Sequence, residues 1–181
     1  MIRNKADYKE YLNRDMGFYY AFSRKERLLY CVLRDPCYLI AKYIRLLRAE
    51  EYHFNTKHRL RYMVALARKN ALGNKLGFKI PRNTIGPGLT IYHHGEIIIN
   101  EDARVGADCK LHGGNCIGNN GKAQAAPMIG DHLDLGIGAK IIGGVVLGNN
   151  VTVGANAVVT KSFCEEGVTL VGIPAEVLHG K

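Results

Sequence analysis

Two adjacent histidines, His93 and His94, lie in the stretch LTIYHHGEIII, between runs of β-branched aliphatic residues. A neutral imidazole can bind a metal ion or accept a proton near neutral pH, and it can also be packed into a core. A third imidazole, that of His112, follows further along the chain in the stretch CKLHGG. The direction in which these side chains point decides among the three roles, and the periodicity of the surrounding sequence predicts that direction.

Large aliphatic residues recur at every sixth position in the second half of the chain. Counting in sixes from Ile99 to Val159 gives a large aliphatic residue at ten of eleven positions, with Ala123 as the exception. An earlier phase containing Ile91 joins this count after a slip of two residues. A six-residue period is typical of parallel β-helices, in which each short strand turns one aliphatic side chain inward. Residues 119–128, NNGKAQAAPM, keep the count but lose the pattern, which predicts a loop projecting from the coil.

The period predicts that the histidine doublet faces outward. If Ile91 points inward, His93 and His94 fall on positions that face solvent or a neighbouring chain. His112 is then expected about one turn of the coil from Tyr92, beside His93. Three neighbouring imidazoles could ligate a metal. Nothing nearby repeats their spacing, and we therefore expect no metal.

The first eighty residues are predicted to be helical. Ser23 and Glu26 fit a capping box, and Asp35 before Pro36 fits a second helix start. Behind it, one apolar stripe has helical spacing and lies opposite a basic face. The stripe contains Leu39, Ile40, Tyr43, Ile44 and Leu47, and the basic face contains Lys42, Arg45 and Arg48. A third helical pattern covers about 57–71, and Gly73 and Gly77 are expected to end it.

Charge and glycine divide the chain near residue 81. Residues 1–80 contain 18 lysines and arginines against 7 acidic residues, whereas residues 81–181 contain 7 against 9 and also 18 of the 21 glycines. We therefore predict an α+β protein, with an α-helical N-terminal domain at 1–80 and a β-helix domain at 81–181 that ends in a short C-terminal tail. The basic helices predict either a solvated face or a contact with an anionic membrane surface. No nucleic-acid-binding motif is present.

The cysteines and the start of the chain indicate the compartment. The five cysteines are odd in number and scattered, which is typical of buried thiols in a reducing cytoplasm rather than of a disulfide framework or a zinc site. The start, MIRNKADYKE, lacks the apolar stretch of a signal peptide. We expect a protein that acts in the cytoplasm or at the inner face of the membrane.

Residues 85–180 resemble the hexapeptide-repeat acyltransferases, especially the serine acetyltransferases and the related polysaccharide O-acetyltransferases. The matching segments are Ile91-x-His93 before Ile97–Asn100, then Cys109-x-Leu111-His112-Gly113, then IGAKIIGGVVLGNNVTVGANAVVTKS, and the closing VGIPAEVL. The resemblance implies a left-handed parallel β-helix that forms a homotrimer, active sites in clefts between coils, and acetyl-CoA as the donor.

The resemblance also implies roles for individual residues. His93 matches the catalytic base, which takes the proton of an acceptor hydroxyl as the oxygen attacks the thioester. His94 and His112 are candidates for orienting it. In GANAVVTK, Ala155 and Thr160 match residues that meet the pantetheine arm or the adenine of acetyl-CoA, and Lys161 matches a residue near a phosphate.

Two departures weaken serine as the acceptor. Serine acetyltransferases have an aspartate just before the catalytic histidine, where this chain has Tyr92, and a second histidine where this chain has Ala126. We therefore expect a hydroxyl of a sugar or of a surface polysaccharide precursor as the acceptor, with L-serine as the alternative. Two other classes stay open: a metal-dependent enzyme of the γ-carbonic anhydrase kind, and a non-catalytic scaffold.

Overall fold

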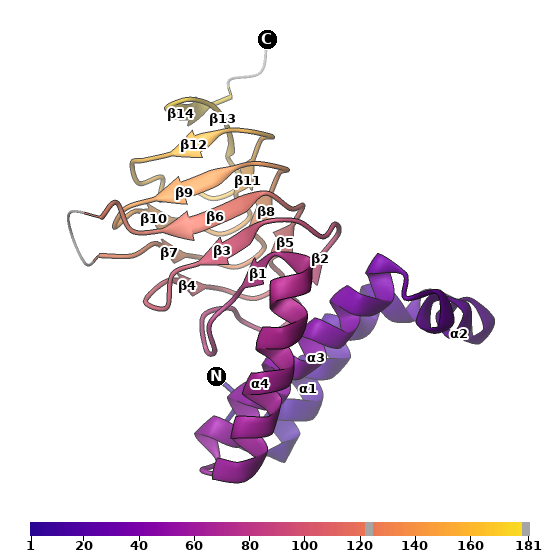
Figure 1. Cartoon of the computed structure of the whole chain (residues 1–181). Helices are drawn as coiled ribbons and strands as arrows, with labels where there is room; N and C mark the ends of the chain where they lie inside the picture. The colour runs from indigo at the N-terminus through magenta and orange to yellow at the C-terminus, as the bar shows by residue number, and fades with distance from the viewer. Residues whose placement is uncertain (122–124, 179–181) are drawn as a thin grey trace.

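The computed structural model describes residues 1–121 and 125–178, which form four helices followed by three sheets of short, mostly parallel strands (Figure 1). The helices are α1 (Lys5–Tyr20), α2 (Arg24–Leu33), α3 (Pro36–Asn55) and α4 (Arg59–Leu76). Helices α1, α3 and α4 pack beneath the first turn of the coil, whereas α2 projects to one side (Figure 1). Within the described residues, no helix combines the length and the apolar character needed to cross a membrane.

The predicted helix starts are confirmed. Ser23 and Glu26 form the reciprocal capping box of α2, and the Asp35 carboxylate accepts a hydrogen bond of 2.8 Å from the Cys37 amide at the start of α3. For helix α1, which lies within the predicted helical domain, no start signal or apolar stripe was identified from the sequence. The side chain of Asn4 caps it by accepting from two amides of the first turn.

Helix α4 continues through Gly73 and ends before Gly77, the second of the two glycines that were expected to end it. A β-carbon on Gly73 would lie 2.6 Å from the carbonyl oxygen of Phe78, so this glycine permits a close approach of the helix to the first strand. Gly77 has φ +77°, the left-handed conformation that ends many helices.

The strands of the second half fall into three sheets. The first sheet contains β1 (Phe78–Lys79), β3 (Ile97–Ile99), β6 (Asn115–Gly118), β9 (Lys140–Ile142) and β12 (Val158–Val159). The second contains β4 (Arg104–Val105), β7 (Met128–Ile129) and β10 (Val146–Leu147). The third contains β2 (Thr90–Ile91), β5 (Lys110–Leu111), β8 (Asp134–Leu135), β11 (Thr152–Val153), β13 (Thr169–Gly172) and β14 (Ala175–Val177). All pairings are parallel except that of β13 with β14.

From β3 to β11 the chain visits the three sheets in turn, so every three strands complete one turn of a coil. Asp134 pairs with Thr152, and the segment between them corresponds to three hexapeptides. Lys110 pairs with Asp134 across a turn that is one hexapeptide longer, because it contains the segment 119–127 between β6 and β7. The loop predicted at 119–128 is therefore consistent with its described ends, while Ala123 and its two neighbours lie outside the described residues.

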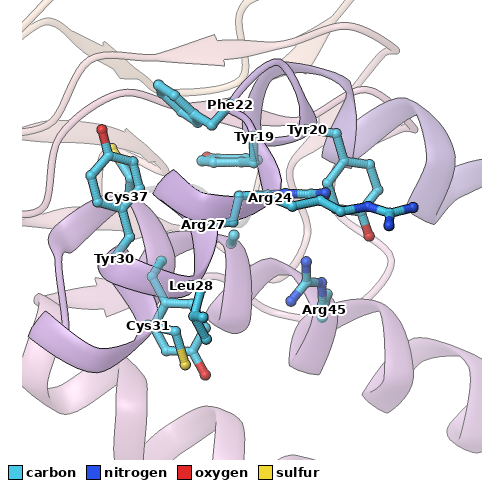
Figure 2. Close-up of a pocket in the computed structure, with 12 residues that line it drawn as sticks. Tyr19, Tyr20, Phe22, Arg24, Arg27, Leu28, Tyr30, Cys31, Cys37 and Arg45 are labelled. Atoms are coloured by element: carbon cyan, nitrogen blue, oxygen red, sulfur yellow. The ribbon is translucent and has the colours of Figure 1, made fainter.

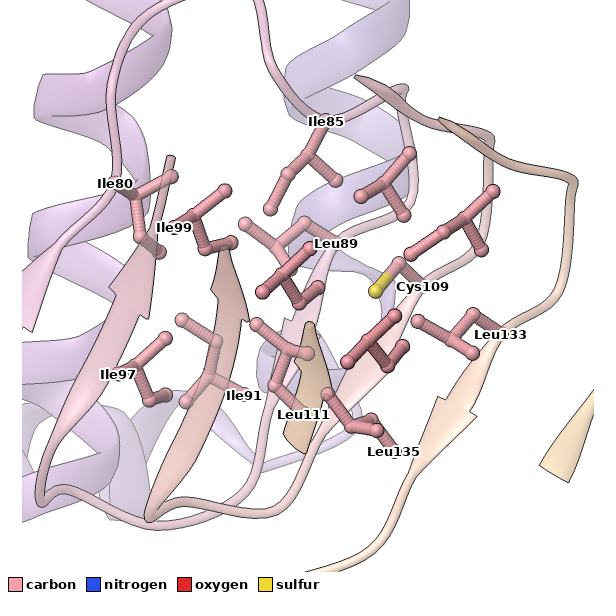
Figure 3. Close-up of a cluster of buried hydrophobic side chains, with 14 of the residues drawn as sticks. Ile80, Ile85, Leu89, Ile91, Ile97, Ile99, Cys109, Leu111, Leu133 and Leu135 are labelled. Carbon is pink, nitrogen blue, oxygen red and sulfur yellow. The ribbon is translucent and has the colours of Figure 1, made fainter. Parts of the chain in front are cut away.

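The inward aliphatic residues of the period are buried, as predicted. The side chains of Ile91, Leu111, Leu135 and Val153 are 0% exposed, and the first three are seen stacked through the coil in Figure 3. The core continues into the helical layer through Tyr43 and Phe78, whose rings lie 5.2 Å apart. The repeat thus forms strands because each inward aliphatic side chain leaves water on stacking, while parallel pairing between successive turns satisfies the backbone amides and carbonyls.

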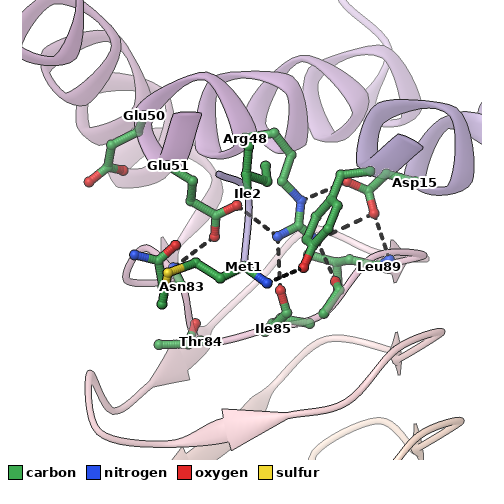
Figure 4. A network of polar contacts seen from close by, with 12 residues as sticks. Met1, Ile2, Asp15, Arg48, Glu50, Glu51, Asn83, Thr84, Ile85 and Leu89 are labelled. Carbon is green, nitrogen blue, oxygen red and sulfur yellow. Dashed lines mark hydrogen bonds and ion pairs between the residues drawn. The ribbon is translucent and has the colours of Figure 1, made fainter. Parts of the chain in front are cut away.

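Arg48 corrects one prediction. It was expected on an exposed basic face, but it is fully buried between α1, α3 and the first turn of the coil (Figure 4). Its guanidinium donates to Asp15 at 2.7 Å, to Glu51 at 3.0 Å and to the carbonyl oxygens of Ile85 and Gly86 at 2.9 and 2.6 Å. This side chain therefore joins the helices to the coil and is not available to a membrane surface.

Two further features differ from the sequence-based expectations. An amphipathic helix normally docks its apolar face on another element, yet Leu28, Leu29 and Val32 on α2 are exposed within this single chain. The cysteines were expected to be buried, but only Cys109 is fully buried, and Cys164 is exposed.

Candidate active site

The histidine doublet lies at the corner between β2 and β3. Ile91 ends β2 with its side chain inside the coil, and His93 and His94 are exposed, as the period predicts. The stretch from Ile91 to Ile99 is two residues longer than the stretch from Ile99 to Val105. The slip of two residues in the period is therefore a corner that is longer than the one after it, and it carries both imidazoles.

The helical layer fixes the strand that leads into this corner. The hydroxyl of Tyr19, on α1, donates to the carbonyl oxygen of Ile91 at 2.9 Å and lies 3.3 Å from the Ile91 amide, which donates to it. Tyr19 is buried, and its burial raises the pKa of the phenol well above its usual value, so the hydroxyl keeps its proton. Two residues before His93, the backbone is thus held by a hydrogen-bonded side chain.

His112 lies one turn from Tyr92, as predicted. Ile91 pairs with Leu111, and the rings of Tyr92 and His112 lie 4.6 Å apart at an interplanar angle of 33°. The ring of Phe18, from α1, also packs against Tyr92, with the two ring centres 5.2 Å apart. Tyr92, which stands where the family has an aspartate, is therefore part of an aromatic cluster.

Asp134 belongs to the same neighbourhood and was not identified from the sequence. Its carboxylate lies 2.9 Å from Nε2 of His112 and 3.8 Å from Nζ of Lys110. Lys110 and His112 lie on the turn of the coil before Asp134. To predict that Asp134 lies beside them, one would have to know the length of the turn that contains the 119–128 loop. Within the described residues, neither His93 nor His94 has a side-chain hydrogen bond of its own, so the carboxylate orients His112 rather than the doublet.

One edge of the coil runs from His93 towards the C-terminus. The register of β2, β5, β8 and β11 places His93, Gly113, Ile137 and Ala155 at equivalent positions of successive turns. The Gly113 carbonyl accepts from the Gly138 amide at 2.9 Å, and the Ile137 carbonyl accepts from the Asn156 amide at 2.9 Å, in agreement with this alignment. At about 4.8 Å per strand, Ala155 lies about 14 Å along the coil from His93.

The other two residues matched to the donor lie elsewhere. Thr160 and Lys161 follow β12 and are exposed at the next corner of the coil. Nζ of Lys161 is 2.8 Å from both carboxylate oxygens of Glu176, on β14, so this ammonium already has an anionic partner. The structure therefore aligns Ala155 with His93 and does not bring Thr160 or Lys161 to the same edge.

No group of three metal-ligating side chains gathers anywhere in residues 1–121 and 125–178. Ala126, which stands at the position of the family's second histidine, is half-buried and packs against the core. The chemical groups at the site are accordingly the exposed imidazoles of His93 and His94, the His112–Asp134 pair and the backbone of the corner.

Comparison with known proteins identifies the family. No protein-family model matches the chain. A serine acetyltransferase of Helicobacter pylori (strain J99) is 34% identical over 120 residues, which are 65% of this chain and 70% of the relative. A serine acetyltransferase of Synechococcus elongatus is 34% identical over 101 residues, which are 55% of this chain and 41% of that protein. The chain thus spans less than half the length of some of these relatives.

A solved structure shows the same fold. The crystal structure of a serine acetyltransferase from Brucella abortus strain S19 superimposes with a TM-score of 0.75 over 96% of this chain and 70% of that one, at 24% identity. Both sequence relatives are serine acetyltransferases, so the expectation of a sugar or polysaccharide acceptor, which rested on Tyr92 and Ala126, is wrong. This chain belongs to the serine acetyltransferase family.

Proposed function

We propose that this protein transfers the acetyl group of acetyl-CoA to the hydroxyl of L-serine and forms O-acetylserine. The similarity to the Helicobacter relative supports the reaction. The observation that carries the proposal is the position of His93, which is exposed at a lengthened corner of the coil and aligned with an edge that contains small residues. An exposed imidazole at such a corner is accessible to both the acceptor and the donor.

His93 would act as the general base. One of its ring nitrogens accepts the proton of the serine hydroxyl as the oxygen attacks the thioester carbonyl carbon. The carbon–sulfur bond then breaks, and the sulfur leaves as CoA with the proton returned from the imidazolium. His94 follows in the same corner, and the His112–Asp134 pair lies one turn away against Tyr92. These groups would shape and polarise the site around the acceptor.

The donor would lie along the edge that contains His93, Gly113 and Ala155. Gly113 has no side chain, and a β-carbon there would lie 3.6 Å from that of His93. No side chain at this position therefore hinders a substrate from approaching the imidazole. Ile137, which is 54% exposed, offers an apolar contact for the pantetheine arm. We assign Ala155 to this contact, and Thr160 and Lys161 to the outer part of the donor at the next corner.

We further propose that the coil is a left-handed β-helix at 81–181, carried by the helical module at 1–80, and that three copies associate. The second sheet supports the association, because Met128 and Val146 are 50% and 45% exposed on neighbouring strands of its outer face. Apolar side chains in such a row are typical of an interface between subunits. The cytoplasmic location stays a prediction.

The test measures CoA release from acetyl-CoA in the presence of L-serine, with O-acetylserine identified by mass spectrometry. We expect serine-dependent turnover by the wild-type chain. His93→Ala should lower kcat by a factor of about 10² to 10⁴, the usual contribution of a general base. His132→Ala is the matched control, because His132 is exposed on the loop before β8. A wild-type chain that is inactive with serine, or a His93→Ala variant of unchanged rate, would refute the proposal.

A further inference from the structure

A pocket of about 470 Å³ lies in the helical layer, between the end of α1, the projecting helix α2 and the start of α3 (Figure 2). All of its lining residues fall between Tyr19 and Arg45, so none belongs to the coil that carries His93. Its size is that of a site for a small molecule. Neither the proposed acetyl transfer nor the family resemblance accounts for it.

Three arginines line this pocket, and none of them forms an ion pair with another described residue. The guanidinium carbon of Arg27, on α2, lies 5.0 Å from the centre of the Tyr20 ring, and that of Arg45, on α3, lies 5.8 Å from the same ring. Arg24 also lines the pocket beside them (Figure 2). In the described part of the chain, the arginines that form ion pairs are Arg14, Arg48 and Arg82.

These two like charges, from different helices, lie over one ring, which attracts each of them while they repel each other. The Glu26 carboxylate of the same helix accepts the Ser23 amide in the capping box, and among the described residues it forms no ion pair with these arginines. A bound anion would relieve the repulsion between the arginines. Guanidinium groups present fixed pairs of donors that match phosphate oxygens, so a phosphorylated ligand fits this arrangement best.

Five of the other nine lining residues are aromatic. The rings of Phe22 and Tyr30 lie 5.4 Å apart, edge to face, and Tyr19 and Tyr38 complete this side of the pocket. Flat aromatic faces stack on planar heterocycles, and stacking of a nucleobase on an aromatic side chain contributes about 1–3 kcal/mol, whichever base is bound. We propose that this pocket binds a phosphorylated small molecule with a planar ring, of the nucleoside diphosphate class, with its phosphates at Arg24, Arg27 and Arg45.

Binding of ADP to the full-length chain, measured by isothermal titration calorimetry, tests the proposal. ADP should bind, and Arg27→Glu and Arg45→Glu should each weaken binding by about tenfold or more, as expected for the loss of a charge-assisted contact. Arg59→Glu, at an exposed arginine at the start of α4, is the matched control and should leave the affinity unchanged. Adenosine and pyrophosphate should each bind at least about tenfold more weakly than ADP, because each lacks half of the recognised groups.

A second measurement uses the wild-type chain and does not depend on the folding of any variant. Cys31 and Cys37 line the pocket and are half-buried, whereas Cys164 is exposed on the coil. ADP should slow the alkylation of Cys31 and Cys37 by iodoacetamide and leave that of Cys164 unchanged.

Three results would overturn the proposal: no binding of ADP, ADP binding that neither charge reversal weakens, or equal protection of all three thiols. Arginine-dependent sedimentation with phosphatidylglycerol vesicles in the absence of ADP binding would likewise overturn it, in favour of a lipid surface. None of these readouts involves acetyl transfer, so the pocket and the proposed reaction stand or fall separately.

Discussion

Replacing Arg48 by methionine tests whether the buried ion-pair network holds the helices on the coil. Methionine is similar in length and apolar, so the variant mainly removes the charge and its donors. Burial alone would lower the pKa of this guanidinium, but the charges of Glu51 and Asp15 raise it, so the wild-type side chain is charged. The variant leaves two carboxylates without their cation in a region where Arg48 and Asp15 are 0% exposed.

The magnitude follows from what each carboxylate keeps. Asp15 still accepts from the Gly88 and Leu89 amides at 2.8 and 2.9 Å, and Glu51 still accepts from the Asn83 amide at 2.8 Å. The carbonyl oxygens of Ile85 and Gly86 lose the Arg48 donor. Breaking a buried ion pair by removing one partner costs about 3–5 kcal/mol, and we expect Arg48→Met to lower the free energy of unfolding by about that amount.

Urea denaturation followed by circular dichroism, at one fixed protein concentration, measures this change. Arg45→Met is the matched control, since Arg45 lies on the same helix, is half-buried and has no carboxylate partner among the described residues; it should cost about 1 kcal/mol or less. If both variants lowered the free energy of unfolding by the same amount, the ion pairs of Arg48 would stabilise the fold no more than the single cation–π contact of Arg45. Our account of how the helices are joined to the coil would then be wrong.

Two further predictions concern glycines and thiols. Gly17→Ala should raise the free energy of unfolding by about 0.5–1 kcal/mol, since nothing lies within 4 Å of the added β-carbon. Gly73→Ala should lower it by about 1–3 kcal/mol, because the added β-carbon clashes with the Phe78 carbonyl. Equal effects of the two substitutions in urea denaturation would contradict this. Burial raises the pKa of the Cys109 thiol to about 12, so at pH 8 only about one molecule in 10⁴ would have its thiolate. Iodoacetamide at pH 8 should therefore modify the exposed Cys164 and spare Cys109 until the chain unfolds, as peptide mass spectrometry would show; modification of Cys109 in the folded protein would refute this.

The coil could be predicted because its core is repeated in the sequence. Most inward residues follow the previous inward residue by a fixed six positions. Leu111, Leu135 and Val153 could therefore be predicted as buried with little knowledge of the loops. The same reasoning predicted that His93 faces outward, since the inward direction of Ile91 fixes the direction of its neighbours. Local signals were equally sufficient where the physical cause is local, as at the Ser23 capping box.

The contacts between distant parts of the chain could not be predicted in this way. Arg48 has the spacing of an exposed basic face, and only the presence of Asp15 on α1, a helix with no identified start signal, reverses that interpretation. The pairing of His112 with Asp134 depends on the length of the turn with the 119–128 loop, which no local pattern fixes. Acceptor specificity was misjudged for a related reason: Tyr92 was considered as a missing acid, whereas the structure shows it within an aromatic cluster.

The edge that we assign to the donor follows from a requirement of the coil itself. Gly113 and Gly138 have φ values of +97° and +71°, and a β-carbon on Gly138 would collide with the side-chain oxygen of Asn156 in the next turn. Tight corners therefore demand glycine for steric reasons, whatever the protein does. Gly113 also leaves the edge without a side chain beside His93, whereas Ile137 projects from it one turn further on. His93, at a corner that is two residues longer than the next, would therefore lie at one end of the edge that we propose for the donor, where its imidazole could reach the thioester of acetyl-CoA bound along that edge.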